Sequence, residues 1–425
     1  MSAPAPRPWW SRILPSRPPP LDAHHWDVLG LVLVAEIASQ YAASLLVMSL
    51  PQIQTSLAIP EAHVGTIGGS VRIGMIATVF VTALADRYGR RRMLLAFTAA
   101  ECVATALTGL VRTEAELVAV QTVLRVFLGA EFMLGAVVIA EEFAASARGF
   151  GIGALSMLGA VGYALGIGLY AALDGLAAGW RYLHLAGALP LLALPALARR
   201  LGETQRFAAQ AAGGAPREPL AAALVRPLRA LVASGRGRVA ALAVFSLAFE
   251  FVSWPALLLV SKHLQHAHGY TPGGVSLVVF AGGLVGVGGN VAAGQLSDRF
   301  GRRPLAVAML AGMAIGTAIL YRGEAAWAPV GWALGSFSMT GCNVILTALS
   351  SELFPTSSRS TAAGFRMSVA SLGGALGFYA EAALFSGSHG AAVVALLPSL
   401  AIAALAVWML PESAGRELEE VAPDA

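Results

Sequence analysis

A short arginine-rich segment occurs twice in this chain of 425 residues. Leu84 to Arg92 reads L-A-D-R-Y-G-R-R-R, and Leu296 to Pro304 reads L-S-D-R-F-G-R-R-P, so Asp86 and Asp298 stand 212 residues apart. Each copy places a carboxylate, several arginines and a glycine suited to a tight turn between two long apolar runs. The repeat therefore predicts two halves of one architecture, each with a charged link between two membrane helices.

The composition requires a membrane around most of the chain. Hydrophobic residues make up 57% of it and charged residues only 12%, too few charges to cover a soluble globule of this size. A bilayer-spanning segment needs about 20 apolar residues and must be helical, because open backbone cannot face lipid. The sequence thus predicts an all-α membrane protein with twelve transmembrane helices in two six-helix pseudo-repeats. The predicted helices are 28–50, 64–84, 93–111, 117–140, 149–172, 182–198, 239–260, 274–296, 305–321, 327–350, 361–385 and 390–410.

The segments outside these helices set the predicted domain boundaries. We expect a disordered cytoplasmic tail at 1–26, a first six-helix half at 27–198, a cytoplasmic linker at 199–238, a second half at 239–410 and a cytoplasmic tail at 411–425. Of the 28 Lys and Arg residues, 21 fall in the segments assigned to the cytoplasm. The positive-inside rule then places both termini in the cytoplasm. The two cysteines lie inside predicted helices and indicate no disulfide framework.

The repeated D-R-x-G-R-R resembles the signature loop of the major facilitator superfamily of transporters. Two further pairs, Glu141 with Arg148 and Glu352 with Arg359, are each seven residues apart and return at an offset of 211. The tail that begins at Pro411, P-E-S-A-G-R-E-L-E-E, is similar to the ending of the sugar porter branch. The resemblance implies that the charged loops form a switchable cytoplasmic gate. The residues expected in this gate are Asp86, Arg87, Gly89, Arg90, Arg91, Glu141, Arg148, Asp298, Arg299, Gly301, Arg302, Arg303, Glu352 and Arg359.

Several ionisable residues fall at membrane depth, where each costs at least about 2.5 kcal/mol unless it faces a cavity or a partner. Glu36, Ser39 and Gln40 share one face of the first helix, and Glu250, Ser253 and Trp254 repeat that spacing in the seventh. Helices one, four, seven and ten line the central cavity in the resembled family. The candidate residues for substrate binding and proton coupling are Glu36, Gln40, Arg72, Arg125, Glu131, Glu250, Trp254 and Asn343.

The fourth helix suggests a coupling mechanism. Arg125 followed by Gly129 resembles the R-x-x-x-G of sugar porters, in which the arginine opposes an acid of the first helix, here Glu36. Our hypothesis is that Glu36 alternately binds a proton and pairs with Arg125, which requires different proton affinities in two states. The competing interpretation is a static pair, Glu36 with Arg125 or Glu131 with Arg72, that holds helices together.

Two further intramembrane charges, Glu101 in the third helix and Arg366 in the eleventh, are expected to form structural pairs.

The seventh helix lacks the Q-Q-x-S-G that sugar porters use for hexoses, so a hexose substrate is doubtful, whereas Arg125 and Arg72 would suit an organic anion. The sequence therefore predicts a proton-coupled transporter of a small organic anion or similar metabolite. The alternatives are a proton-driven exporter of drugs or metabolites and a non-transporting membrane sensor. No phosphate-binding loop, H-E-x-x-H or nucleophile elbow indicates an enzyme.

We expect the molecule to need no cofactor and to bind no metal or nucleic acid. Its partners are a small-molecule substrate, protons and the lipid bilayer, and a monomer in the bacterial inner membrane is expected. The three histidines His263, His266 and His268, which cluster beyond the seventh helix, are expected in a solvated loop.

Overall fold

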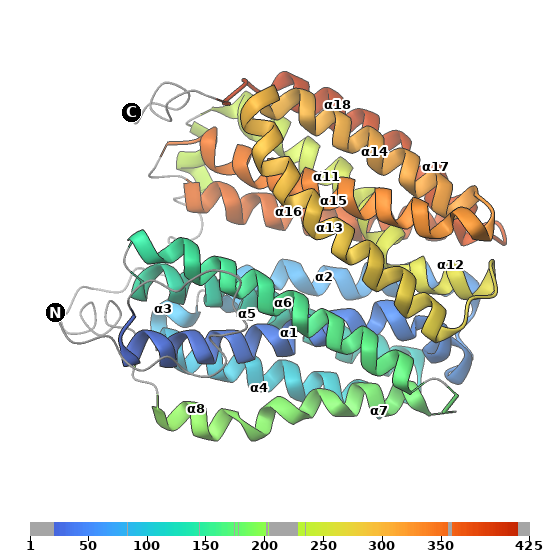
Figure 1. Ribbon diagram of the computed structural model, residues 1–425, viewed down its shortest axis with the longest axis horizontal. Coiled ribbons are helices and arrows are strands. Elements are labelled where there is room, and N and C mark those ends of the chain that lie inside the picture. Colours follow the sequence, from blue (N-terminus) through green and yellow to red (C-terminus); the bar gives the residue numbers. More distant parts are fainter. Residues whose placement is uncertain are drawn as a thin grey trace. The chain divides into compact units, whose positions relative to one another are not determined.

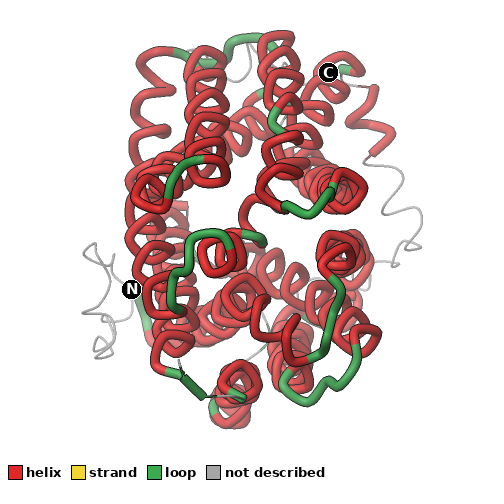
Figure 2. Tube along the Cα trace, turned by 90° about the vertical axis from the view of Figure 1, so that its right-hand side faces the viewer, coloured by secondary structure: helices red, strands yellow, loops and turns green. Residues whose placement is uncertain are grey.

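The computed structural model describes residues 21–82, 84–143, 145–173, 175–176, 178–200, 203, 228–233, 235–355 and 359–414, without the side chains of residues 79, 86, 145, 146, 148, 149, 200 and 360. The predictions for the amino-terminal tail, for most of the linker and for the chain beyond residue 414 lie outside these ranges. Within them the backbone forms helices and connecting loops and no strand (Figure 2).

The first six membrane helices follow the predicted order. The first five are single helices. The sixth is broken into three pieces around Pro190 and Pro195, because proline lacks the N–H that an uninterrupted helix needs. Two short elements, η2 (Glu61–His63) and α3 (Leu84–Tyr88), connect the early helices. The helices are α1 (Ala23–Ser56), α2 (Val64–Thr82), α4 (Arg90–Thr108), α5 (Glu114–Glu142), α6 (Ala145–Ala172) and the sixth, composed of α7 (Gly179–Leu185), η3 (Ala186–Leu192) and α8 (Leu194–Arg200).

The last six membrane helices repeat this plan. The twelfth is interrupted at Leu397, directly before Pro398, for the same reason as the sixth. The seventh helix is followed, after Leu259, by the short α12 (Val260–His266), and η4 (Ala325–Trp327) precedes the tenth. The helices are α11 (Arg236–Leu258), α13 (Pro272–Phe300), α14 (Arg302–Arg322), α15 (Ala328–Glu352), α16 (Arg359–Leu384) and the pair α17 (His389–Leu396) and α18 (Pro398–Met409).

Eleven of these segments are long and apolar enough to cross a bilayer by length and composition alone. The third, α4, is not among them because it begins with three arginines and carries Glu101 in its interior. The fold is nevertheless that of twelve membrane helices in two repeats of six, as predicted. Charge at the end of a helix and one buried carboxyl lower its apparent hydropathy without preventing it from crossing.

By their contacts the residues fall into two units, and each is considered by itself. The first comprises residues 1–49 and 77–217, and the second comprises residues 50–76 and 218–425. In the first unit α4 packs along α5. In the second, α13 and α14 both pack on α15, and α11 packs on α16 and α18 (Figure 1). The carboxyl-terminal end of α1, from residue 50 on, and most of α2 therefore belong, by contact, with the second unit.

Glycines allow several of these helices to approach closely. A β-carbon at Gly162 of α6 would collide with the carbonyl oxygen of Ile37 on α1. One at Gly377 of α16 would collide in the same way with the carbonyl oxygen of Phe251 on α11. Helix backbones therefore come into close contact at these glycines, as small residues allow.

Candidate functional site

A cluster of carboxyl groups lies inside the first unit, where α1, α4 and α5 meet. The hydroxyl of Ser39 on α1 lies 2.6 Å from Oε2 of Glu101 on α4 and 2.9 Å from Oε2 of Glu131 on α5. Both carboxylic side chains belong to fully buried residues, with 0% of their surface exposed. Sequence reasoning identified Glu131 but treated Glu101 as a separate structural residue. In the sequence, the one feature that pointed to this cluster was Ser39, which shares its helical face with Glu36.

Glu36 lies one turn from Ser39 on the same helix. Its Oε1 accepts a hydrogen bond of 2.8 Å from the side-chain amide of Gln40, and the residue is 2% exposed. Gly159 of α6 provides the space for this carboxyl, since a β-carbon there would lie 2.8 Å from the same oxygen. The face predicted from the spacing of Glu36, Ser39 and Gln40 therefore points into the interior of the first unit.

Arg125, the predicted partner of Glu36, interacts electrostatically with the phenol of Tyr163 on α6. Among the described residues, Glu36 and Arg125 form no ion pair with each other in this state. The proposed switch between them therefore stays a prediction.

A second group of candidate residues lies in the second unit. The guanidinium carbon of Arg72 on α2 lies 3.4 Å from the ring centroid of Trp254 on α11, within the range of a cation–π contact. Gly374 of α16 makes room for the stacked pair. A β-carbon there would lie 2.6 Å from Cδ1 of Trp254 and 3.2 Å from Nε of Arg72.

Glu250 lies on the same helix as Trp254 and is nearly buried. It interacts electrostatically with Arg72 and with Arg366 of α16, a residue that sequence reasoning assigned to structural pairing only. Asn343 on α15 is half-buried and its side-chain amide donates a long hydrogen bond of 3.4 Å to the carbonyl of Met339. Two cationic groups, one carboxyl and one indole are thus gathered around α2, α11 and α16.

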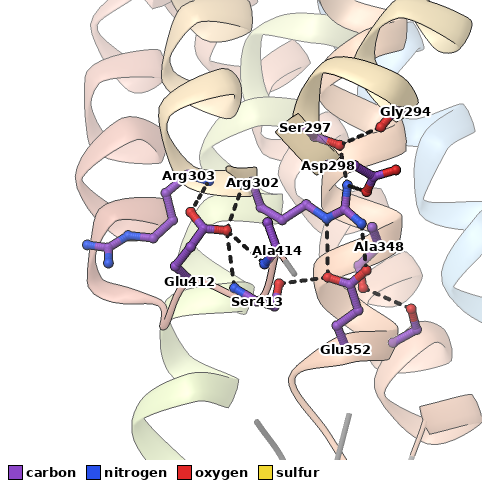
Figure 3. Close-up of polar contacts among 11 residues, drawn as sticks. Gly294, Ser297, Asp298, Arg302, Arg303, Ala348, Glu352, Glu412, Ser413 and Ala414 are labelled. Atoms are coloured by element: carbon purple, nitrogen blue, oxygen red, sulfur yellow. Dashed lines mark hydrogen bonds and ion pairs between the residues drawn. The ribbon is translucent and has the colours of Figure 1, made fainter. Parts of the chain in front are cut away.

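The charged loop of the second half forms a compact network (Figure 3). Nη2 of Arg302 lies 2.9 Å from Oε1 of Glu352, and its Nη1 lies 2.7 Å from Oδ1 of Asp298. The carboxylate of Glu412 accepts hydrogen bonds from the backbone N–H groups of Arg302 at 2.7 Å and Arg303 at 3.0 Å. The hydroxyl of Ser413 donates to Glu352 at 2.6 Å. The start of α14 is therefore joined to the end of α15 and to the tail after α18.

Glu412 is held ionised by these contacts. Partial burial, the largest single influence, raises its pKa, but the backbone N–H donors of Arg303, Arg302, Ala414 and Ser413 together outweigh it and lower the pKa from its usual value. A carboxylate at the amino terminus of a helix is also favoured by the helix dipole.

The charged loop of the first half makes the corresponding contacts at the equivalent positions of the internal repeat. Nη2 of Arg90 lies 3.3 Å from Oε1 of Glu141, and the backbone N–H of Arg91 donates to Oε1 of Glu203 at 2.8 Å. The guanidinium of Arg91 donates to the carbonyl of Ala198, as that of Arg303 does to the carbonyl of Trp408. The contact of Glu203 with the loop was not predicted from the sequence.

The other expected gate residues are arranged as follows. Gly89 and Gly301 adopt φ angles of 106° and 98°, which favour glycine, so they form the expected turns. The exposed guanidinium groups of Arg87 and Arg299 lie 5.8 Å and 5.3 Å from the neighbouring aromatic rings. The guanidinium of Arg359 donates to the carbonyl of Phe354 at 3.4 Å. The side chains of Asp86 and Arg148 lie outside the described part.

A polar network that sequence reasoning missed joins η2, α12, α16 and α17 in the second unit. Oε2 of Glu61 lies 2.7 Å from Nζ of Lys262 and 3.0 Å from Nε2 of His389, whose Nδ1 lies 2.6 Å from Oε1 of Glu381. Lys262 also donates to the side chain of Gln54. No period or motif in the sequence indicates this network, because its members come from three distant regions of the chain, residues 54–61, Lys262 and residues 381–389.

These features define a membrane transporter with an internal repeat, and comparison with known proteins gives its family. The family model described as Major Facilitator Superfamily matches residues 32–252 and again residues 239–423. The chain belongs to the major facilitator superfamily, and it is a transporter and not an enzyme.

Three relatives span most of this chain and most of their own length. A probable 4-methylmuconolactone transporter of Cupriavidus pinatubonensis is 26% identical over 88% of this chain and 87% of its own. A gallate transporter of Pseudomonas putida is 26% identical over 93% of this chain and 94% of its own. A 3-(3-hydroxy-phenyl)propionate transporter of Escherichia coli is 28% identical over 84% of this chain and 87% of its own.

Solved structures agree with the fold. The crystal structure of a D-xylose-proton symporter has a TM-score of 0.74 and 20% identity, covering 93% of this chain and all of the other. The inward-facing, unoccupied structure of a bacterial homolog of the human lysosomal transporter Spinster has the same TM-score at 18% identity, covering 91% and 97%. At these identities the likeness concerns the fold alone.

Proposed function

We propose that this chain is a proton-coupled secondary transporter that moves an organic anion containing a ring by alternating access. The observation that carries the proposal is the guanidinium of Arg72, stacked 3.4 Å above the ring of Trp254. A planar guanidinium binds a carboxylate through two parallel hydrogen bonds, and an indole offers an apolar face to a ring. Together they supply complementary contacts for the two parts of such a substrate.

The neighbouring residues support this assignment. Gly374 leaves the stacked pair the space that a larger side chain would occupy. Glu250 and Arg366 place further charge beside it, and polar groups of the substrate other than its carboxylate would meet them. Asn343 remains a proposed polar contact on α15.

The relatives favour the same class of substrate. Gallate and 3-(3-hydroxyphenyl)propionate, named for two of them, are aromatic carboxylates, and methylmuconolactone is a ring compound as well. None of these three names is that of a sugar, which accords with the absence of the hexose motif from the seventh helix.

Proton coupling is assigned to Glu36. Its buried carboxyl is hydrogen-bonded to Gln40, whereas Arg125 interacts with Tyr163. Protonation of Glu36 in one state and its pairing with Arg125 in the other would give the proton different affinities in the two states, as coupling requires. The two charged loops act as the cytoplasmic gate of this cycle.

We further propose that the transporter resides as a monomer in a bacterial inner membrane with both termini in the cytoplasm. The distribution of Lys and Arg supports this orientation, because 21 of 28 then lie in cytoplasmic segments or tails. The named relatives come from bacteria.

The test uses purified protein in liposomes with an external pH-sensitive dye. Gallate and 3-(3-hydroxyphenyl)propionate are added one at a time, with xylose and a cationic aromatic amine as comparisons. We expect the aromatic carboxylates alone to make the outside more alkaline as proton and anion enter together. External acidification on adding the cationic amine would instead indicate a proton-driven exporter and overturn the proposal.

Variants of Arg72 locate the site. Charge-assisted hydrogen bonds contribute about 1.5–3 kcal/mol, so Arg72→Gln should weaken apparent affinity by roughly 10- to 100-fold. Arg72→Lys keeps the charge but loses the planar fork, and we expect it to recover only part of the affinity. Arg322→Gln, at an exposed position at the end of α14, is the control. Unchanged affinity in Arg72→Gln would contradict the assignment.

A further inference from the structure

Two buried carboxyl groups of the first unit contact one serine hydroxyl. Oγ of Ser39 lies 2.6 Å from Oε2 of Glu101 and 2.9 Å from Oε2 of Glu131. A serine has a single hydroxyl hydrogen to donate, and an ionised carboxylate can only accept. If both carboxyls were ionised, one of the two contacts would lack its own hydrogen. A hydrogen on one of the carboxyls makes both contacts full hydrogen bonds.

The charges of the cluster lead to the same conclusion. Glu101 and Glu131 are 0% exposed, and no Lys or Arg of the described residues forms an ion pair with either. The other titratable groups that act on them are Glu36 and Cys102, neither of which brings positive charge. Two carboxylates so close together cannot both remain ionised without a cation.

The remaining oxygens of the two carboxyls are also informative. Oε1 of Glu101 and Oε1 of Glu131 are buried and have no hydrogen-bond partner among the residues that the structure describes. An unsatisfied oxygen costs more on a buried carboxylate than on a neutral carboxyl group, because the charged form loses more solvation. Two ionised groups with one bare oxygen each would be the least favourable arrangement of this cluster.

We propose that Glu101, Ser39 and Glu131 form a proton-binding site that holds at least one proton in this state. A neutral carboxyl donates its hydrogen to Oγ of Ser39, and the Ser39 hydroxyl donates to the other carboxyl. If a proton on Glu131 passes to Ser39 while the Ser39 hydrogen passes to Glu101, the two roles exchange without change in total charge.

The site lies beside the proposed coupling carboxyl. Glu36 is one helical turn from Ser39 on α1, and its Oε2 is buried without a hydrogen-bond partner. Glu36 is therefore the next group able to exchange a proton with the pair. This role in transport rests on the proposed function, whereas the protonation of the pair stands independently of it.

The first test measures protonation directly, by infrared spectroscopy of the purified full-length protein at neutral pH. The readout is the carbonyl stretch of a neutral carboxylic acid and its shift in deuterated water. All measurements are made in a Glu36→Gln background, so that the third carboxyl of the cluster cannot contribute. Glu324→Gln, at an exposed position before η4, serves as the control, and size-exclusion chromatography verifies that each variant is folded.

We expect a neutral-acid band in the background protein and in the control, and a loss of band intensity when Glu101→Gln and Glu131→Gln are combined. Ser39→Ala should shift the band because the bridging hydrogen bond disappears, and Ser39→Thr, which keeps a hydroxyl, should restore its position. A band that is absent from the background protein, or whose intensity is undiminished by the double substitution, would overturn the proposal. Exchange of choline chloride for sodium chloride should leave the band unchanged, and its loss in sodium would assign the site to a metal cation instead.

The second test addresses the role in transport. In liposomes that contain wild-type Glu36, the combined Glu101→Gln and Glu131→Gln substitutions should abolish alkalinisation by an aromatic carboxylate, while Glu324→Gln should leave it intact. Undiminished alkalinisation in the double variant would remove the pair from the coupling pathway. If the wild-type protein moves no protons with any tested anion, the proposed function fails, and the infrared result still decides whether the proton site exists.

Discussion

Arg302 binds Glu352 in the second half as Arg90 binds Glu141 in the first. The distances from Nη2 to Oε1 are 2.9 Å and 3.3 Å, and each arginine directly follows the turn glycine of its loop segment. Each pair joins the start of the third helix of its half to the end of the fourth. The charged loops are thus built mainly from contacts inside one half, and the internal repeat extends to individual side chains.

The Arg302 to Glu352 pair should contribute measurably to stability. Both side chains are mostly buried, at 13% and 19% exposure, and the guanidinium also contacts Asp298. Arg302→Lys keeps the charge but cannot reproduce the contacts of Nε and Nη2 with the carboxylate. We expect a loss of about 1–3 kcal/mol, seen as a lower midpoint of thermal unfolding. Arg299→Lys, exposed in the same loop, should change the midpoint little, and equal effects of the two variants would refute the prediction.

Glu412 should stabilise the protein in a pH-dependent way. Because its pKa is lowered in the folded state, its contribution is present at neutral pH and is lost as the pH falls through that lowered pKa. Glu412→Gln removes the charge that the start of α14 favours. We expect the variant to unfold at a lower temperature than wild type at neutral pH, with a difference that shrinks on acidification. A difference that grows towards acid pH would be inconsistent with this account.

Gly374 offers a test of the proposed substrate contacts that alters neither contacting residue. Gly374→Ala would place a β-carbon 2.6 Å from Trp254 and 3.2 Å from Arg72, so the stacked pair must shift. Overpacking typically costs 1–3 kcal/mol, and we expect apparent affinity for an aromatic carboxylate to fall by about tenfold. Gly364→Ala on the same helix meets no atom within 4 Å and is the matched control. Uptake titrations that give the same affinity for both variants would show that the stacked pair does not bind substrate.

Glu61 should be a stability determinant of the second unit although 47% of its side chain is exposed. Its carboxylate binds Lys262, whose side chain is only 3% exposed, and His389. Glu61→Gln would leave Lys262 buried without its carboxylate, and we expect a loss of about 1–3 kcal/mol in thermal or denaturant unfolding. Glu324→Gln, an exposed carboxyl in the same unit, provides the comparison. A loss no larger than that of Glu324→Gln would mean that the network has no stabilising role.

Much of the fold follows from local sequence. The twelve helices lie within about six residues of their predicted ranges, because apolar runs long enough to span a bilayer are a local property of the sequence, although Glu101 interrupts the run in α4. The turn glycines Gly89 and Gly301 and the pairing of the loop arginines with acidic residues also followed from the repeat. The specific acidic partner of each loop arginine did not follow from the sequence. Glu352 was expected to pair with Arg359, but its ion-pair partner among the described residues is Arg302, which lies 50 positions away in the chain.

The sequence by itself determined the membrane character of this protein, its two repeated halves and the charge-bearing ends of its helices. These properties depend on composition and period, which are local. Only the tertiary structure brought Glu101 and Glu131 to one hydroxyl of Ser39 and placed the guanidinium of Arg72 on the ring of Trp254. A helical period shows which side chains share a face, but the rotation and close approach of neighbouring helices decide which faces meet. Glycines such as Gly159 and Gly374 permit that close approach because they have no side chain, and no pattern within one helix shows which faces will meet there.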